Sequence, residues 1–278
     1  MQFVSNTDAL ILDLRNNHGG NGTMANEILS YFFGDSTYVG RNFNKLENTW
    51  TDNYIKNTVE ITDGIELKMP VYILTSKGTY SAGEGLAYTL QALRNAVVIG
   101  DVTKGGAHLT RTFSLGNGFV GFIPYLRGEN VKTKTDWEGV GVIPDIVSEE
   151  SKSLLAAQNI ILEKKLTAAT DDNEKRKIKW LINYLSSKNS DLIVDNVQAE
   201  KFTGRYAEFE ITLNKNDLLF RDVNQPDGQF KKMTAITPVL FQAGNDYQLE
   251  FITDEKGIYN SIQIYWEDGW LEIIKRTK

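Results

Sequence analysis

The sequence has 278 residues, of which 41% are hydrophobic and 24% charged, a composition typical of a soluble globular protein. Its 36 acidic and 30 basic residues give a net charge of −6, so there is no basic excess, and nucleic-acid binding is not expected. Cysteine is absent, which excludes disulfides, thiolate metal sites and a cysteine nucleophile. With two histidines, a multi-histidine metal site is not expected either, and no cofactor is predicted.

The sequence predicts neither a membrane anchor nor a signal peptide. No apolar run approaches the roughly 20 residues that a membrane-spanning helix needs. Residues 1–7 lack the basic and apolar blocks of a leader. These features fit a protein that is either cytoplasmic or has had a leader removed. The length fits one large domain and a smaller one.

The first half of the chain alternates apolar runs with helical patterns. Buried strands are predicted for residues 9–14 (ALILDL), 70–75 (PVYILT) and 96–100 (AVVIG). Helices are predicted after the first two strands, from the spacing of Met24, Ile28, Leu29 and Phe32 and of Leu86, Leu90 and Leu93. Strands that alternate with helices indicate an α/β core with parallel strands over residues 1–150. The polar stretch 35–68 is interpreted as an insertion, without assigned structure.

The second half of the chain has a different character. Residues 151–195 predict a helical segment with two helices, at 152–169 and 172–188, and capping residues between them. The apolar stripe of the second helix consists of Ile178, Leu181, Ile182 and Leu185.

Short alternating apolar runs then predict a small antiparallel β domain over residues 196–278, with turns at 226–228 and 254–257. Its aromatic residues Tyr265, Trp266 and Trp270 are expected to pack in the core of this domain, although a binding face would have the same composition.

Ser81 follows a predicted strand and a tight turn, and it begins a predicted helix. Its hydroxyl would lie where the free amides and the positive dipole end of the helix converge, a place that suits an oxyanion. Ser81 and Glu84, three positions later, also match the capping box, in which both side chains only satisfy free backbone amides. Taken alone, the spacing favours the cap.

The turn at residues 15–22 contains Gly19 and Gly20 directly after a predicted strand. Glycine permits backbone conformations that direct amides outward, as donors to an oxyanion. A loop that only needs positive φ angles explains the same glycines, and on this turn alone that is the simpler interpretation.

Four segments favour a catalytic site over a simple helix cap and glycine loop, because they occur together and in order. Residues 9–20 (ALILDLRNNHGG), 74–88 (LTSKGTYSAGEGLAY), 98–108 (VIGDVTKGGAH) and 137–146 (WEGVGVIPDI) resemble the consecutive signature blocks of peptidase family S41. This family includes the C-terminal-processing, tricorn and retinoid-binding-protein-like branches. The resemblance covers about residues 1–150 and implies a ClpP/crotonase-like core of ββα units. It also implies a serine endopeptidase of the tail-specific type, which cleaves unstructured peptides or protein C-termini.

The resemblance assigns roles to individual residues by position. Ser81 is similar to the family's acylating nucleophile. The amide of Ala82 and an amide of the Gly19–Gly20 turn are similar to its oxyanion hole. A serine hydroxyl must also lose its proton to attack an amide carbonyl, so a general base is needed.

In the C-terminal-processing branch, the resemblance places this base on a lysine in the glycine-rich turn after the third strand. Alignment on Thr103 puts Gly106 at that place. Lys104 stands two positions earlier. It is interpreted as an ordinary exposed lysine, because a two-residue displacement moves an amine by several ångströms at about 3.3 Å per residue.

The tricorn and retinoid-binding-protein-like branch implies a serine, a histidine and an acidic residue. Glu138 is similar to that acidic residue, although a carboxylate that binds backbone amides beside a glycine turn would look the same. The histidine of that branch lies upstream of residue 9, outside this sequence. His18 and His108 are candidate substitutes, and an ordinary hydrogen-bonding or solvent-facing role is favoured for each.

Two classes of function therefore stay open. One is a serine peptidase that acts through Ser81. The other is a noncatalytic module on the same fold that binds a peptide or a hydrophobic ligand, or a truncated remnant without its base. The resemblance also implies an extracytoplasmic location in the bacterial envelope. Because relatives have further strands before residue 9, either a dimer or a fragment of a longer polypeptide is expected.

Overall fold

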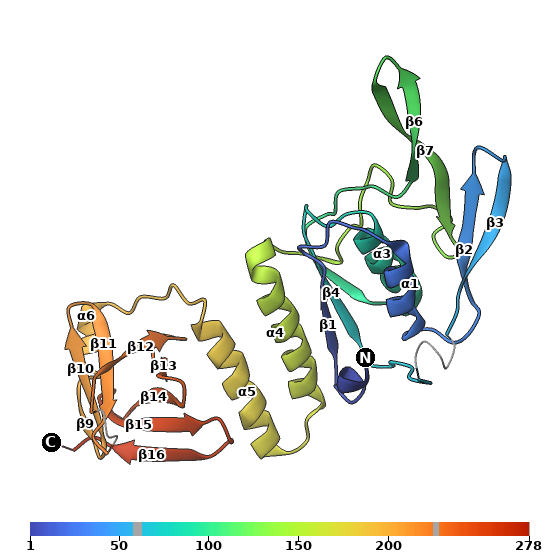
Figure 1. The fold of residues 1–278 in the computed structure, drawn as a ribbon. Coiled ribbons are helices and arrows are strands. Elements are labelled where there is room, and N and C mark those ends of the chain that lie inside the picture. The colour runs from blue at the N-terminus through green and yellow to red at the C-terminus, as the bar shows by residue number, and fades with distance from the viewer. Residues whose placement is uncertain (58–62, 225–227, 278) are drawn as a thin grey trace. The chain divides into compact units, whose positions relative to one another are not determined.

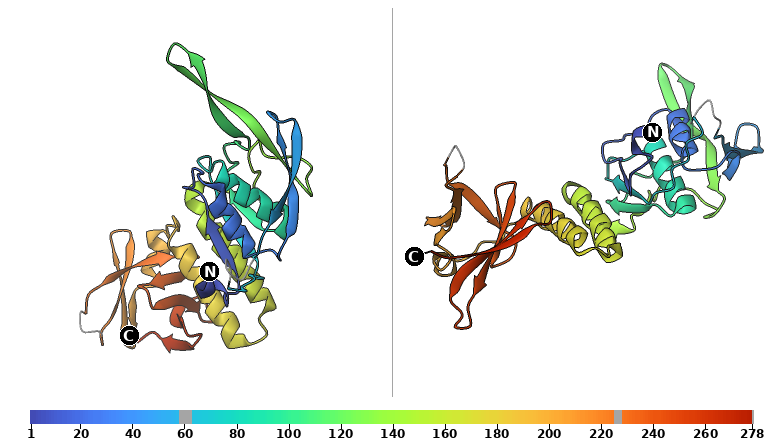
Figure 2. Two further views of the ribbon diagram at one scale, coloured as in Figure 1. Left: turned by 45° about the vertical axis from the view of Figure 1, so that its right-hand side comes forward. Right: turned by 90° about the horizontal axis from the view of Figure 1, so that it is seen from below.

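The computed structural model describes residues 1–57, 63–224 and 228–277 (Figures 1 and 2). The chain divides into two compact units, residues 1–157 and 158–278. Among the described helices, none combines the length and the apolar composition that crossing a bilayer requires.

The first unit is built around a sheet of four parallel strands in the order β1-β4-β5-β8. Its strands are β1 (Leu10–Asp13), β4 (Val71–Thr75), β5 (Val97–Gly100) and β8 (Ile146–Val147). The three predicted apolar runs form β1, β4 and β5, and β4 is buried at every residue. The predicted α/β core with parallel strands is confirmed. In this sheet β1 is an edge strand, with β4 as its neighbour.

Helices α1 (Gly22–Ser30) and α3 (Ala82–Arg94) lie side by side against this sheet (Figure 1). Leu86 and Leu90 of α3 are buried in the core, as the spacing predicts. In α1 the prediction is wrong for Met24, which is 60% exposed. The helix begins at Gly22, and its inward face carries the predicted Ile28 and Leu29 together with Ala25.

A second sheet of the first unit has the order β3-β2-β7-β6 and is antiparallel. It consists of β2 (Thr37–Asn44), β3 (Thr49–Ile55), β6 (Leu109–Gly116) and β7 (Phe119–Asn130). Strands β2 and β3 lie in the stretch 35–68, which has no assigned structure in the sequence analysis; residues 58–62 of that stretch are outside the described residues. A side chain at Gly40 of β2 would overlap the backbone of Glu129 in β7, so this close pairing requires glycine.

Helix α4 (Glu150–Ala168) contains the division between the units, so the first unit extends beyond the predicted residue 150. Helix α5 (Asp172–Ser187) follows, and the side chain of Asp171 caps it by accepting the amide of Glu174. On the predicted stripe of α5, Ile178 is buried but Leu181 is 44% exposed.

The rest of the second unit is a short helix α6 (Asn196–Glu200) and an antiparallel sheet, whose eight strands follow one another in sequence order. The predicted antiparallel β domain is confirmed. An isolated bridge from Arg205 to Thr277 links the first strand to the end of the chain, which brings the sheet close to a closed barrel. The strands are β9 (Gly204–Tyr206), β10 (Phe209–Asn214), β11 (Asp217–Asp222), β12 (Lys231–Ala235), β13 (Leu240–Ala243), β14 (Tyr247–Thr253), β15 (Tyr259–Trp266) and β16 (Leu271–Lys275).

Aromatic side chains fill the core of this β domain. Phe202 stacks on Phe251 with ring centroids 4.1 Å apart, and Trp266 packs against the same core as predicted. The prediction is wrong for Trp270, which is 65% exposed because it lies in the turn between β15 and β16. The predicted turn at 254–257 joins β14 to β15, whereas residues 226 and 227 of the other predicted turn are outside the described residues.

Candidate active site

Ser81 has a strained backbone in the turn between β4 and α3. Its φ of 50° and ψ of −115° fall outside the regions that residues with a side chain normally occupy. A serine on a strained strand-to-helix turn is a known way to expose a nucleophilic hydroxyl. Ala82, the next residue, begins α3, and its amide is among those at a helix start that lack an intrahelical acceptor.

The carboxylate of Glu84 is fully buried and connects Ser81 to a distant turn. One oxygen, Oε2, accepts the amide of Ser81 at 2.7 Å and the amide of Gly106 at 3.0 Å. The other, Oε1, accepts the Thr103 hydroxyl and the Gly105 amide, each at 2.6 Å. The predicted capping box is therefore present, and its acidic member is this carboxylate. It does more than cap the helix, because it fixes the turn after β5 against the residue that carries the hydroxyl.

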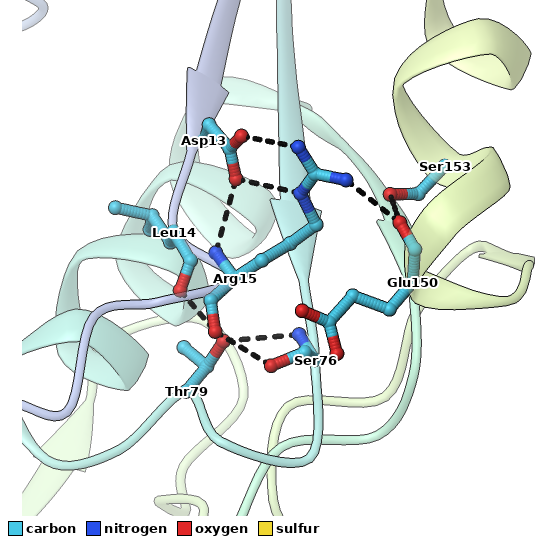
Figure 3. Close-up of polar contacts among 7 residues, drawn as sticks. All are labelled: Asp13, Leu14, Arg15, Ser76, Thr79, Glu150 and Ser153. Atoms are coloured by element: carbon cyan, nitrogen blue, oxygen red, sulfur yellow. Dashed lines mark hydrogen bonds and ion pairs between the residues drawn. The ribbon is translucent and has the colours of Figure 1, made fainter.

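Two hydroxyl groups hold the turn before Ser81 against the turn after β1 (Figure 3). The Ser76 hydroxyl donates to the carbonyl of Arg15 at 2.6 Å, and the Thr79 hydroxyl donates to the carbonyl of Leu14 at 2.8 Å. Both serine and threonine are buried. Buried hydroxyls with short bonds to backbone fix relative positions, since their loss would leave unsatisfied polar atoms.

The side chain of Arg15 also anchors the start of α4 (Figure 3). Its guanidinium binds Asp13 with a shortest distance of 2.6 Å and donates to the carbonyl of Glu150 at 2.7 Å. The hydrogen bonds from Arg15, opposed by partial burial, lower the pKa of the Asp13 carboxyl below its ordinary value.

The Gly19–Gly20 turn packs directly against Ser81. Gly19 has φ of 89° and Gly20 has φ of 141°. A side chain at Gly19 would lie 2.8 Å from Cβ of Ser81 and 3.5 Å from the amide nitrogen of Ala82. The amide of Gly19 donates to Oδ1 of Asn17 at 2.9 Å, which makes the Gly20 amide the better candidate for an oxyanion donor beside that of Ala82.

A cavity of about 260 Å³ opens beside Ser81. Its apolar lining includes Ala25, Leu29, Val39, Tyr88, Leu126 and Trp137, and its polar lining includes Asn26, Arg41, Asn53 and Asp136. An apolar cavity with a few polar groups is the usual form of a site for a side chain or a small ligand.

Tyr80 occupies the space beside Gly106. A side chain at Gly106 would overlap the Tyr80 ring, so a lysine does not fit at this position while the ring is in place. Lys104 is exposed, as predicted, and its Nζ lies 5.0 Å from the centroid of the same ring. Its amide donates to the carbonyl of Thr79, which joins the turn after β5 to the turn that precedes Ser81.

His108 lies between two carboxylates. Its Nε2 is 3.1 Å from Oδ2 of Asp136, and its Nδ1 is 3.9 Å from Oε2 of Glu138. Glu138 accepts the amides of Ala107 and His108 at 2.7 Å and 2.9 Å, so it binds backbone amides beside a glycine turn. Asp136 also lines the cavity beside Ser81, so the carboxylate partner of His108 belongs to the candidate site.

His18 is placed differently. Its ring is exposed, and Nδ1 lies 2.9 Å from the carbonyl of Gly78. This carbonyl partner fixes the orientation of the ring.

Glu84 and Asp136 make contacts in this site that the sequence does not predict. The contacts of Glu84 with the turn at 103–106 are long-range, and no local spacing encodes them. Asp136 directly precedes the fourth signature block. Its place beside that block is the one sequence feature that points to a role in the site. Among the described residues, no group of three or more histidine and acidic residues could hold a metal ion.

Comparison with known proteins identifies relatives of the first unit. Residues 1–148, just over half of the chain, match the model of Peptidase family S41. The carboxyl-terminal-processing peptidase 2 of Arabidopsis thaliana chloroplasts is 32% identical over 146 residues, which is 51% of this chain and 26% of that protein. The carboxyl-terminal-processing protease of Synechocystis is 29% identical over 143 residues, which is 51% of this chain and 31% of that protein. The chain thus spans about a quarter to a third of the length of these relatives.

Among solved structures, the photosystem II D1 C-terminal processing protease is similar, with a TM-score of 0.43 and 22% identity. The match covers 54% of this chain and 36% of that one.

Proposed function

The chain belongs to peptidase family S41, and from this premise we propose that its first unit is a serine endopeptidase of the C-terminal-processing type. The two relatives named for carboxyl-terminal processing support a substrate that is a peptide or a protein C-terminus. An extracytoplasmic location is part of the same proposal.

One observation carries this proposal: Ser81 is strained at the start of α3 and packs against the Gly19–Gly20 turn. In the proposed reaction, Oγ of Ser81 attacks the substrate carbonyl and forms a tetrahedral intermediate. The amides of Gly20 and Ala82 stabilise the oxyanion of this intermediate. The intermediate collapses with cleavage of the peptide C–N bond, the base passes the proton taken from Ser81 to the leaving amine, and water then hydrolyses the acyl group from Ser81.

We assign the general base to His108, oriented by Asp136. A carboxylate partner favours the protonated imidazole that forms when the serine proton is accepted, which is the logic of a serine, histidine and aspartate triad. Asp136 is 3.1 Å from His108 and lines the same cavity as Ser81. Glu138 assists by fixing the backbone of His108.

A second function is favoured by the contact between Tyr80 and Gly106. The ring fills the place at which the resemblance to the C-terminal-processing branch puts the base lysine. A chain whose base is missing would retain the cavity and bind a peptide without cleaving it. This alternative predicts binding without acylation.

Labelling with a fluorophosphonate and turnover of an unstructured fluorogenic peptide separate the two functions. We expect the native chain to be labelled and Ser81→Ala to lose both labelling and at least about 10³-fold in turnover. His108→Gln should lower turnover, whereas His18→Gln, the matched control, should not. Equal turnover by Ser81→Ala would refute the peptidase. Retention of the peptide without labelling would support the binding module.

A further inference from the structure

A two-stranded ribbon, which we call the arm (residues 109–125), projects from the core of the first unit (Figure 1). Strand β7 pairs with β2 only over its last residues, from Leu126 to Asn130. Tyr125, at the root of the arm, still accepts the amide of Lys45, but from Phe119 to Pro124 β7 pairs with β6 alone, and β6 has β7 as its one neighbour among the described strands. An isolated two-stranded ribbon is marginally stable in water.

The arm exposes large apolar side chains on both of its faces. Phe119 and Phe122 are 70% and 71% exposed. Leu115 and Ile123 lie on one face and cover Gly121, where an added side chain would lie 3.3 Å from Cδ1 of Leu115; both are exposed, at 63% and 45%. Contiguous exposed apolar side chains of this size mark a binding surface.

The free edge of β6 offers a second kind of contact. Backbone amides and carbonyls on an edge strand can pair with another extended chain, and apolar side chains beside the edge then contact alternate side chains of that chain. The chemistry of the arm thus fits an unfolded polypeptide with apolar residues, because only such a chain has both its backbone and its apolar side chains free.

The root of the arm is part of the candidate active site. Ala107, Leu109 and Leu126 line the same cavity as Ser81. Leu109 is the first residue of β6 and pairs with Leu126 of β7. An extended chain that lies along the edge of β6 therefore continues into the cavity beside Ser81.

We propose that the arm binds the substrate polypeptide as an added strand antiparallel to β6, and that it holds the residues upstream of the cleaved bond. The inference rests on the proposed function. Strand β6 runs from the cavity at Leu109 to the tip at Gly116, so an antiparallel chain enters at the tip and reaches Ser81 in its N-to-C direction. Antiparallel pairing is the more stable arrangement per residue, and it matches the pairing of β6 with β7. The eight residues of β6 set the length of the upstream segment.

Three fluorogenic peptides test this inference on the full chain: a core peptide, and the same peptide extended by eight apolar, β-prone residues on either the upstream or the downstream side. We expect the upstream extension to raise kcat/KM about tenfold over the core peptide, the effect in affinity of burying about one large apolar side chain. The downstream extension should have little effect. Phe119→Ser and Phe122→Ser should each reduce the upstream gain and leave turnover of the core peptide unchanged. Phe3→Ser, which changes a phenylalanine that is 88% exposed outside the arm, is the matched control.

Equal gains from the two extensions, or an upstream gain that survives both arm substitutions, would overturn the inference. If the native chain does not cleave the core peptide, the proposed function fails instead. Fluorescence anisotropy of the labelled extended peptides then tests the arm separately, with tighter binding of the upstream form expected. A dimer in sedimentation that Phe119→Ser dissociates, together with no upstream preference, would assign the arm to a second copy of the chain and refute substrate binding.

Discussion

The candidate active site and the β domain are held together by different forces. Around Ser81, a buried carboxylate and buried hydroxyls fix turns that come from distant parts of the sequence. In the β domain, Phe202 contacts Phe241, Phe251 and Tyr259, and the core is apolar. Apolar packing is nondirectional and mainly stabilises, whereas hydrogen bonds fix atoms within a few tenths of an ångström. We therefore expect substitutions around Ser81 to lower activity as well as stability, and substitutions in the core of the β domain to lower stability alone.

The largest effect is expected for Glu84→Ala. The substitution leaves four donors without their acceptor, and each buried donor left unsatisfied costs about 1–3 kcal/mol. The turn at 103–106 and the amide of Ser81 should move, and a shift of about 1 Å in a site can lower kcat/KM by about 100-fold. Denaturant unfolding and peptide turnover measure both losses. The matched control is Glu149→Ala, since Glu149 is an exposed glutamate of the same unit that pairs with Lys152 and is not among the residues lining the cavity. Full activity of the Glu84 variant would contradict the role of this carboxylate.

A smaller loss, confined to stability, is expected for Phe202→Ala. Removal of this fully buried ring should cost about 3–5 kcal/mol in the unfolding of the β domain. Labelling of Ser81 by a fluorophosphonate should stay at the native level in the absence of denaturant, because the substitution lies in the second unit. Trp270→Ala, at an exposed aromatic position, serves as the control with an expected change below about 0.5 kcal/mol. Loss of Ser81 labelling in Phe202→Ala would show that the two regions are not separable.

The smallest effect is expected for Asp13→Asn. Arg15 lowers the pKa of Asp13 in the folded state from its ordinary value of 3.8, so folding favours the ionised carboxyl. The resulting stability is fully present above the unfolded pKa and is lost as pH falls through the folded pKa. Because Asp13 is about half exposed, its contribution is a few tenths of a kcal/mol. Melting curves should show the variant less stable than the native chain at about pH 6 and equal to it near pH 2. A difference that is the same at both values would contradict this assignment.

The sequence predicts the buried strands and the order of the signature blocks well, because apolar runs and helical spacing are local properties. Strands β2 and β3 are not predicted, since 35–68 is mostly polar. Their apolar contribution to the core is limited to isolated residues such as Val39 and Ile55, and β2 is held between β3 and β7. The prediction that Met24 is buried is wrong because the spacing of apolar residues identifies the buried face of a helix but not the residue at which the helix begins.

The site is predictable only in part. The strand-turn-helix pattern indicates Ser81 and the glycine turn, which the structure brings together. Three of the four hydrogen bonds of Glu84 depend on a turn about twenty residues away, and the contact of His108 with Asp136 also joins residues far apart in the sequence. Local spacing carries no information on such contacts, which only the tertiary fold creates.

The overlap between the Tyr80 ring and any side chain at position 106 also limits how this sequence can evolve. A mutation that replaces Gly106 meets the ring unless Tyr80 moves or is shortened first. The two positions are therefore epistatic: a side chain in this turn becomes tolerable once residue 80 is smaller, which sets the order in which the two changes are accepted.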